Sequence, residues 1–205
     1  MLSVQYGDSC YSIGVAKASD IISVGCGKNF VTYNSQLMYL NHGTSNHQVW
    51  SIGHQLKSNQ LYYLNSFGTM VYVPLDDPSN KRTLFPANPS HNPSRIAMND
   101  DYLAVSNAEG YPLLVHSFGL KTSNSYYLYG KWLRSLKFHP DGDLIMLDND
   151  GLVCQYRIED DKAPTLIWDC QIKGAYALCV DQNRGLVYVT GQENTLLIIS
   201  AGMCI

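Results

Sequence analysis

The residues of this chain that could do chemistry begin with its histidines. His42, His47 and His54 lie five and seven residues apart in a stretch rich in loop-forming residues. A metal site needs three or four ligands that converge and are themselves held in place. No cysteine or glutamate stands near these histidines to complete such a set. We therefore predict solvated loop histidines here, and no metal.

Carboxylates offer a second chemistry, the hydrolysis of glycosidic bonds, which needs two carboxyl groups that face one bond. The chain has only three glutamates. Two of them, Glu109 and Glu193, fall at equivalent turns of a repeat and could share a face, and Asp148 and Asp150 belong to the turn between them. Acidic residues at such positions commonly accept hydrogen bonds from the backbone N–H groups of the turn. We therefore predict that these residues support turns.

Nucleophilic catalysis and phosphate binding leave no signature in the sequence. There is no G-x-S-x-G motif, no cysteine adjacent to a histidine and no glycine-rich phosphate loop. We predict that the chain is not an enzyme and needs no cofactor.

Aromatic side chains point more strongly to a function. Trp50 and Trp132 lie close to the ends of repeats, and a group of tyrosines leads into Trp132. Most aromatic residues of a repeat protein pack between its units. Those left in loops form recognition hot spots, because Trp and Tyr combine apolar area with a polar group. The residues predicted to bind a partner are Trp50, Tyr126, Tyr127, Trp132, Asp150, Glu109 and Glu193.

A repeat of about 42 residues positions these side chains. Its unit is a strand, a turn, a second strand, a tighter turn and a third strand. The tighter turns centre on positions 27, 68, 110, 151 and 194, at separations of 41, 42, 41 and 43 residues. Each centre is Gly or Asn, which tolerate positive φ, and the flanking runs are rich in Val, Ile, Leu and Tyr. This pattern predicts an all-β chain, a β-propeller of about five four-stranded blades in a single domain over residues 1–205.

Each predicted blade also needs a first strand and an outer strand. The first strands are expected at residues 12–15, 49–52, 95–98, 135–138 and 176–180. The outer strands are expected at residues 36–40, 82–85, 126–129 and 166–171. The last repeat has too few residues left for an outer strand, and the alternating residues 2–6 could supply one and close the ring. The alternative is an open five-blade array that a partner chain completes.

Composition narrows the choice of partners. The net charge is −3 and there is no basic cluster, which disfavours nucleic acid. No run approaches the roughly 18 apolar residues of a membrane span, and the first ten residues lack the features of a secretion signal. The six cysteines form no C-x-x-C motif and are expected to be reduced thiols, as in the cytoplasm or the nucleus.

Residues 136–156 resemble one blade of the WD-repeat β-propeller family. They read L-K-F-H-P-D-G-D-L-I-M-L-D-N-D-G-L-V-C-Q-Y. The run F-H-P-D-G at 138–142 is similar to the family's turn between the first two strands, and residues 150–151 to its acidic turn before the third. Tyr156-Arg157 stands in place of the family's Trp-Asp pair, and the Gly-His pair before the first strand is absent. The resemblance implies a scaffold that holds other proteins on its faces or rim, and it does not imply catalysis.

These observations predict a non-enzymatic protein-interaction scaffold or adaptor, a subunit of a larger intracellular assembly whose partners are other proteins. Two alternatives stay open. One is a carbohydrate-binding propeller lectin, against which the poor identity between repeats weighs, since lectin propellers often repeat their sites. The other is a five-bladed glycosidase-like enzyme, against which the scarcity of glutamate weighs.

Overall fold

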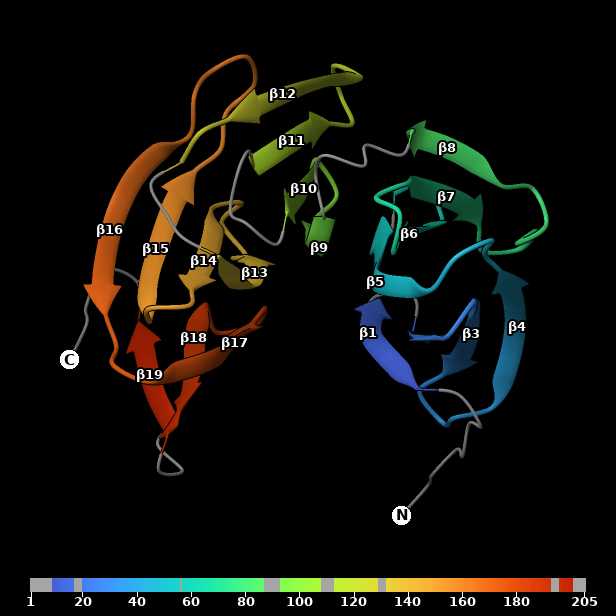
Figure 1. Cartoon of the computed structure of the whole chain (residues 1–205), viewed down its shortest axis with the longest axis horizontal. Coiled ribbons are helices and arrows are strands. Elements are labelled where there is room, and N and C mark those ends of the chain that lie inside the picture. Colours follow the sequence, from blue (N-terminus) through green and yellow to red (C-terminus); the bar gives the residue numbers. More distant parts are fainter. Residues whose placement is uncertain are drawn as a thin grey trace. The chain divides into compact units, whose positions relative to one another are not determined.

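The structure is a computed structural model that describes residues 9–16, 20–55, 57–86, 93–107, 113–128, 132–192 and 196–200. In these residues the chain forms nineteen β-strands and no α-helix. The strands make five antiparallel sheets, and neighbouring strands of each sheet follow one another in the sequence (Figure 1). A small sheet in this up-and-down order is the unit from which a β-propeller is built. The predicted all-β propeller fold is confirmed, with one sheet for each predicted repeat.

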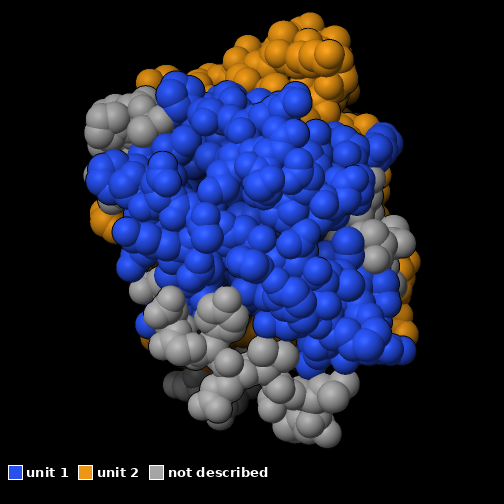
Figure 2. Space-filling view, turned by 90° about the vertical axis from the view of Figure 1, so that its right-hand side faces the viewer, with its two compact units in different colours: residues 1–96 blue, residues 97–205 orange. Residues whose placement is uncertain are grey.

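The chain divides into two compact units, residues 1–96 and residues 97–205, which Figure 2 shows in blue and orange. The boundary falls inside β9 (Pro93–Met98), the first strand of the third sheet. The single domain over residues 1–205 stays a prediction.

The first unit holds the sheets β1-β2-β3-β4 and β5-β6-β7-β8. Their strands are β1 (Cys10–Ala16), β2 (Ile21–Cys26), β3 (Asn29–Asn34), β4 (Tyr39–Thr44), β5 (Val49–Gln55), β6 (Gln60–Asn65), β7 (Met70–Pro74) and β8 (Arg82–Phe85). The core between them contains the buried side chains of Phe30, Val49, Leu61 and Tyr63. Gly43 in β4 makes room for the Phe30 ring, because a Cβ atom at this position would collide with it.

The second unit holds the sheets β9-β10-β11-β12, β13-β14-β15-β16 and β17-β18-β19. The strands after β9 are β10 (Tyr102–Asn107), β11 (Leu113–Ser117), β12 (Thr122–Tyr126), β13 (Leu133–Phe138), β14 (Leu144–Asp148), β15 (Leu152–Arg157), β16 (Thr165–Gln171), β17 (Ala175–Asp181), β18 (Leu186–Gly191) and β19 (Leu196–Ser200). Successive side chains of a strand point to opposite faces. Leu144 and Met146 of β14 therefore join a core with the third sheet, whereas Ile145 and Leu147 join a core with the fifth.

The tight turns between second and third strands have the conformation that the repeat predicts. Gly27, Gly68 and Gly151 have φ values of 55°, 79° and 87°. In the fourth sheet, Oδ1 of Asp148 accepts the backbone N–H groups two and four residues further on, at 2.9 and 2.8 Å. Asn65 holds the turn of the second sheet in the same way. The predicted turn-supporting role is therefore confirmed for Asp148, and the other two predicted turns lie outside the described residues.

The predicted first strands are confirmed, because each predicted range lies inside β1, β5, β9, β13 or β17. Among the outer strands, residues 82–85 and 166–171 are confirmed by β8 and β16.

Two predicted outer strands are wrong. The sequence predicts one at residues 36–40, but Oδ1 of Asn34 accepts the N–H groups of residues 36 and 38 and folds this segment into a turn, so that β4 begins only at Tyr39. The strand predicted at residues 126–129 is β12, which ends at Tyr126. It reads T-S-N-S-Y, a polar strand directly after a turn, so hydrophobicity does not reveal it.

The prediction of reduced cysteines is wrong for Cys10 and Cys26, which form a disulfide with Cα atoms 3.9 Å apart. The pairing of β1 with β2 places these two residues directly opposite each other, a relation that their separation of 16 positions in the sequence does not reveal. Cys170 is disulfide-bonded as well, whereas Cys154 and Cys179 are free thiols.

The fifth sheet has three described strands, β17, β18 and β19. Residues 2–6, which the sequence offers as its outer strand, lie outside the described residues, so closure of the ring stays a prediction.

Candidate interaction surface

In each unit the tight turns lie beside the connections that lead into first strands. In the second unit, the N–H of Asn149 donates to the carbonyl oxygen of Trp132 at 2.8 Å, and the N–H of Gln192 donates to that of Gly174 at 2.9 Å. In the first unit, the N–H of Ser66 makes the same kind of bond to the connection before β5. In these three sheets the tight turn therefore lies at the same end as the connection that leads into a first strand.

A cluster of five residues, linked by backbone and side-chain contacts, occupies this end of the fourth and fifth sheets. We call it the Trp132 cluster: Trp132, Arg134, Asn149, Tyr176 and Gln192. Arg134 Nε donates to Asn149 Oδ1 at 2.8 Å, and the Arg134 guanidinium lies 5.0 Å from the centre of the Tyr176 ring. Gln192 Nε2 donates to the Tyr176 hydroxyl at 3.3 Å. Trp132 is 55 % exposed and Tyr176 is 50 % exposed, so the cluster offers a partner two large aromatic side chains, one of them held from two sides.

A register shift near the start of several first strands changes the direction of the side chain at that position. In β5, β13 and β17 the register with the next strand shifts across the second residue. That residue is Trp50 in β5, Arg134 in β13 and Tyr176 in β17. A β-bulge redirects the side chain at the irregular position, and bulges are common beside functional sites. The fold thus presents a large side chain at the same place in three sheets.

The corresponding end of the first unit carries a different aromatic pair. The rings of His47 and Phe67 lie with their centroids 4.0 Å apart, and Phe67, in the tight turn, is exposed. Trp50 is half-buried between the buried Val49 and Ser51. Each unit therefore has an aromatic group at this end of its sheets, but the residue types in the two groups differ.

The other residues predicted to bind a partner are scattered. Asp150 is exposed in the turn next to Asn149, and Tyr127 is exposed directly after β12. Tyr126 is half-buried and packs against the core of the second unit. Glu109 and Glu193 lie outside the described residues.

Sequence reasoning missed Arg134 and Tyr176, although a signal exists. Trp50, Arg134 and Tyr176 are 84 and 42 residues apart, two repeats and one repeat. Aligning the repeats at the start of the first strand would have shown one large side chain recurring there.

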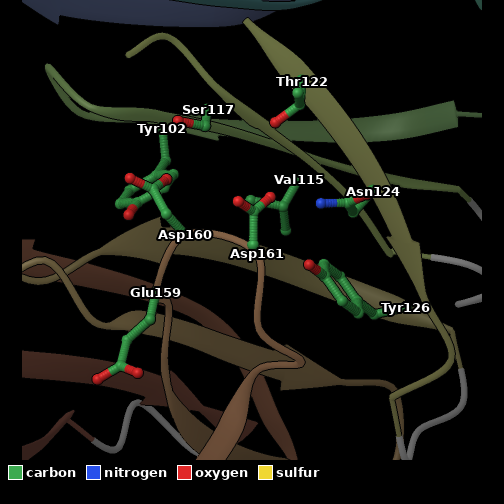
Figure 3. Close-up of a pocket in the computed structure, with 9 residues that line it drawn as sticks. All are labelled: Tyr102, Val115, Ser117, Thr122, Asn124, Tyr126, Glu159, Asp160 and Asp161. Carbon is green, nitrogen blue, oxygen red and sulfur yellow. The ribbon is translucent and has the colours of Figure 1, made fainter. Parts of the chain in front are cut away.

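An acidic pocket lies elsewhere in the second unit, under the loop between β15 and β16 (Figure 3). Its lining residues are Tyr102, Val115, Ser117, Thr122, Asn124, Tyr126, Glu159, Asp160 and Asp161. Asp160 lies against Tyr102, and burial together with this carboxylate raises the pKa of Tyr102 to about 12. The cavity volume is about 10 Å³, which is the room that one water molecule needs. The pocket is therefore far too small for an organic ligand.

One buried pair has the elements of a nucleophile and a base. Ser23 Oγ lies 2.8 Å from His54 Nε2, but Ser23 is completely buried and burial lowers the pKa of His54 to about 4. A substrate cannot reach this hydroxyl, so the pair supports the fold. The prediction of three solvated loop histidines is accordingly wrong for His54, which alternation along β5 turns inward; it is also wrong for His42, which is exposed but lies in strand β4.

The described residues contain no group of three or more His, Cys, Asp or Glu side chains placed to hold a metal ion. They also contain no helix long and apolar enough to cross a membrane.

Comparison with solved structures places the fold. The chain is similar to the β-propeller domain of Cps50 (Swd1) from Myceliophteria thermophila, with a TM-score of 0.68 and 11 % identity over 92 % of this chain and 82 % of that one. It is similar also to the WD40 β-propeller domain of Doa1, with a TM-score of 0.58 and 11 % identity over 94 % and 79 %. The fold is that of a WD40 β-propeller. No family model matches the chain, and neither does any curated protein.

Proposed function

We propose that this chain is a non-enzymatic protein-interaction module, a scaffold or adaptor within a larger intracellular assembly. WD40 propellers are typically interaction modules. The observation that carries the proposal for this chain is the recurring register shift that presents Trp50, Arg134 and Tyr176 at the start of first strands. Trp, Arg and Tyr are the three residue types in which binding hot spots are most enriched.

The Trp132 cluster is the strongest single candidate for the contact. Its hydrogen bonds already hold Tyr176 and Arg134 in place, so a partner loses less side-chain entropy when it binds there. Its composition differs from that of the His47 and Phe67 pair, which argues against a lectin with one sugar site per blade.

The test compares Tyr176→Ala with Leu120→Ala, an exposed apolar residue in the turn between β11 and β12 of the same unit. Tagged full-length chains are incubated with native extract, and captured proteins are quantified by mass spectrometry. We expect a stoichiometric protein partner whose affinity, measured with the purified partner, falls at least about 10-fold for Tyr176→Ala and is unchanged for Leu120→Ala. No stoichiometric protein partner, together with sugar-selective binding on a glycan array, would replace the proposal by the lectin.

The intracellular location is part of the proposal. Oxidising compartments favour disulfides such as Cys10–Cys26, so this bond argues against an intracellular location. Counting free thiols on protein trapped by rapid alkylation in its own cells decides between them: a cytoplasmic or nuclear protein keeps these two cysteines reduced.

A further inference from the structure

A polar pocket lies in the first unit, between the end of β4 and the connection from β7 to β8 (Figure 1). Its lining residues are His42, Gly43, Thr44, Pro78, Ser79 and Lys81. Its cavity volume is about 240 Å³, far more than the room that one water molecule needs. Pockets that hold whole organic ligands begin at about 300 Å³. The pocket therefore fits a small polar or ionic group.

Alternation along β4 places two polar side chains at this pocket. His42 and Thr44 are two residues apart, so they lie on the same face of the strand, and both are exposed. Gly43 between them packs on the buried Phe30 ring. The Tyr39 hydroxyl lies 2.5 Å from Nδ1 of His42. When the hydroxyl donates in this pair, the ring hydrogen sits on Nε2, which can then donate to a ligand.

The connection between β7 and β8 supplies a positive charge. Lys81 Nζ donates to the Thr44 hydroxyl oxygen at 3.1 Å. The ammonium keeps further N–H groups for a ligand, and the hydroxyl that accepts this bond keeps its own hydrogen to donate. Backbone bonds hold the connection, because the N–H of Lys81 donates to the Ser79 carbonyl at 3.0 Å and that of Asn80 to the Asp77 carbonyl at 3.1 Å. Lys81 is thus held in place before a ligand arrives, which lowers the entropy lost on binding.

The acidic residues nearby do not neutralise the pocket from within. Among the described residues that line it, none is acidic. Asp77, in the connection, accepts the hydrogen of the Ser79 hydroxyl. The lining side chains therefore carry the positive charge of Lys81 without a carboxylate among them, which favours an anion as the ligand.

We propose that this pocket binds a phosphate group carried by a side chain of a partner protein. A phosphorylated side chain presents three acceptor oxygens. The pocket offers a donor from each of three residues, which are Lys81, Thr44 and His42. A carboxylate has one oxygen fewer, and lysine binds phosphate well as a point charge. The net charge of −3 and the lack of a basic cluster disfavour the backbone of a nucleic acid.

This site goes beyond the Trp132 cluster, which belongs to the second unit. Amide chemical shifts of the full chain, measured by NMR, test it. The probes are inorganic phosphate and three peptides, acetyl-Gly-Xaa-Gly-amide with phosphoserine, serine or glutamate as Xaa, at one pH and constant ionic strength. We expect phosphate and the phosphoserine peptide to shift the amides of Gly43, Thr44 and Lys81 with dissociation constants of about 1 mM or lower. The serine peptide should shift none of them, and the glutamate peptide should bind at least about 10-fold more weakly than the phosphoserine peptide.

Two variants and a matched control locate the binding. Lys81→Gln removes the charge from the pocket and should weaken binding of the phosphoserine peptide at least about 10-fold. Thr44→Val removes only the hydroxyl and should weaken it about 5-fold. Lys57→Gln removes the same charge from an exposed turn between β5 and β6 of the same unit and should leave the affinity unchanged. The remaining amide shifts of each variant show that it is folded.

Four results would overturn the proposal. No shift of the pocket amides at about 10 mM probe means that the pocket binds no anion. Equal weakening by Lys57→Gln means that the overall charge of the chain attracts the probe. Equal affinity for the glutamate peptide means that any acidic side chain is accepted, and binding of inorganic phosphate without the phosphoserine peptide means that the site holds only a free ion. None of these results bears on Tyr176, so they are distinct from a failure of the proposed function.

Discussion

Acidification should destabilise the first unit through His54. This side chain is 8 % exposed and its Nε2 bonds to Ser23, while Nδ1 has no hydrogen-bond partner among the described residues. Burial lowers the pKa of His54 from 6.5 to about 4, because a charged imidazolium would lose its hydration there.

The direction in which stability changes with pH follows from which state binds the proton. Between pH 6.5 and pH 4 the unfolded chain protonates His54 and the folded chain does not. The contribution to stability is therefore complete above about pH 6.5, is lost as the pH falls, and is constant again below about pH 4. For these two pKa values, the free energy of unfolding falls by about 2 kcal/mol between pH 7 and pH 5.

Urea unfolding at several pH values between 5 and 7.5 measures this effect. We compare the wild type with His54→Gln, which keeps a polar group beside Ser23 but does not titrate. Other ionisable groups are the same in both chains, so they cancel in the difference. We subtract the free energy of unfolding of His54→Gln from that of the wild type. We expect this difference to fall by about 2 kcal/mol between pH 7 and pH 5. Curves that stay parallel would refute the argument.

Three further predictions concern stability, each measured by urea or thermal unfolding. Asp148→Ala removes both hydrogen bonds of its turn and should cost about 1–2 kcal/mol; a cost below about 0.5 kcal/mol would contradict the role given to this carboxylate. Leu144→Ala leaves a cavity in a fully buried position and should cost about 2–5 kcal/mol, whereas the exposed Leu120→Ala should change stability by less than about 0.5 kcal/mol. Cys10→Ser opens the disulfide that closes a loop with a sequence separation of 16, and should cost about 2–4 kcal/mol in the absence of reductant; an unshifted melting curve would show that the bond does not stabilise the fold.

Much of the architecture can be predicted from local properties of the chain. The tight turns need positive φ, so Gly27, Gly68 and Gly151 mark them. First strands alternate and are apolar, and every predicted one lies inside an observed strand. Outer strands bury little, so their sequences carry a weak signal. The predicted ranges of β4 and β12 are wrong for this reason. Hydrogen bonds to the side chain of Asn34 decide where β4 begins, and a turn decides where β12 begins.

Some features of the candidate surface follow from local sequence, and others depend on how the strands pack together. Trp132 and the turn at Asp150 could be predicted, because both sit at loop positions that the repeat defines. The contact of Arg134 with Tyr176 could not, because the two residues are 42 positions apart and meet only when β13 packs against β17. The Cys10–Cys26 disulfide likewise depends on the pairing of β1 with β2. Local sequence sets the backbone conformation of each turn and strand, whereas the distances between side chains of different strands follow from register and packing.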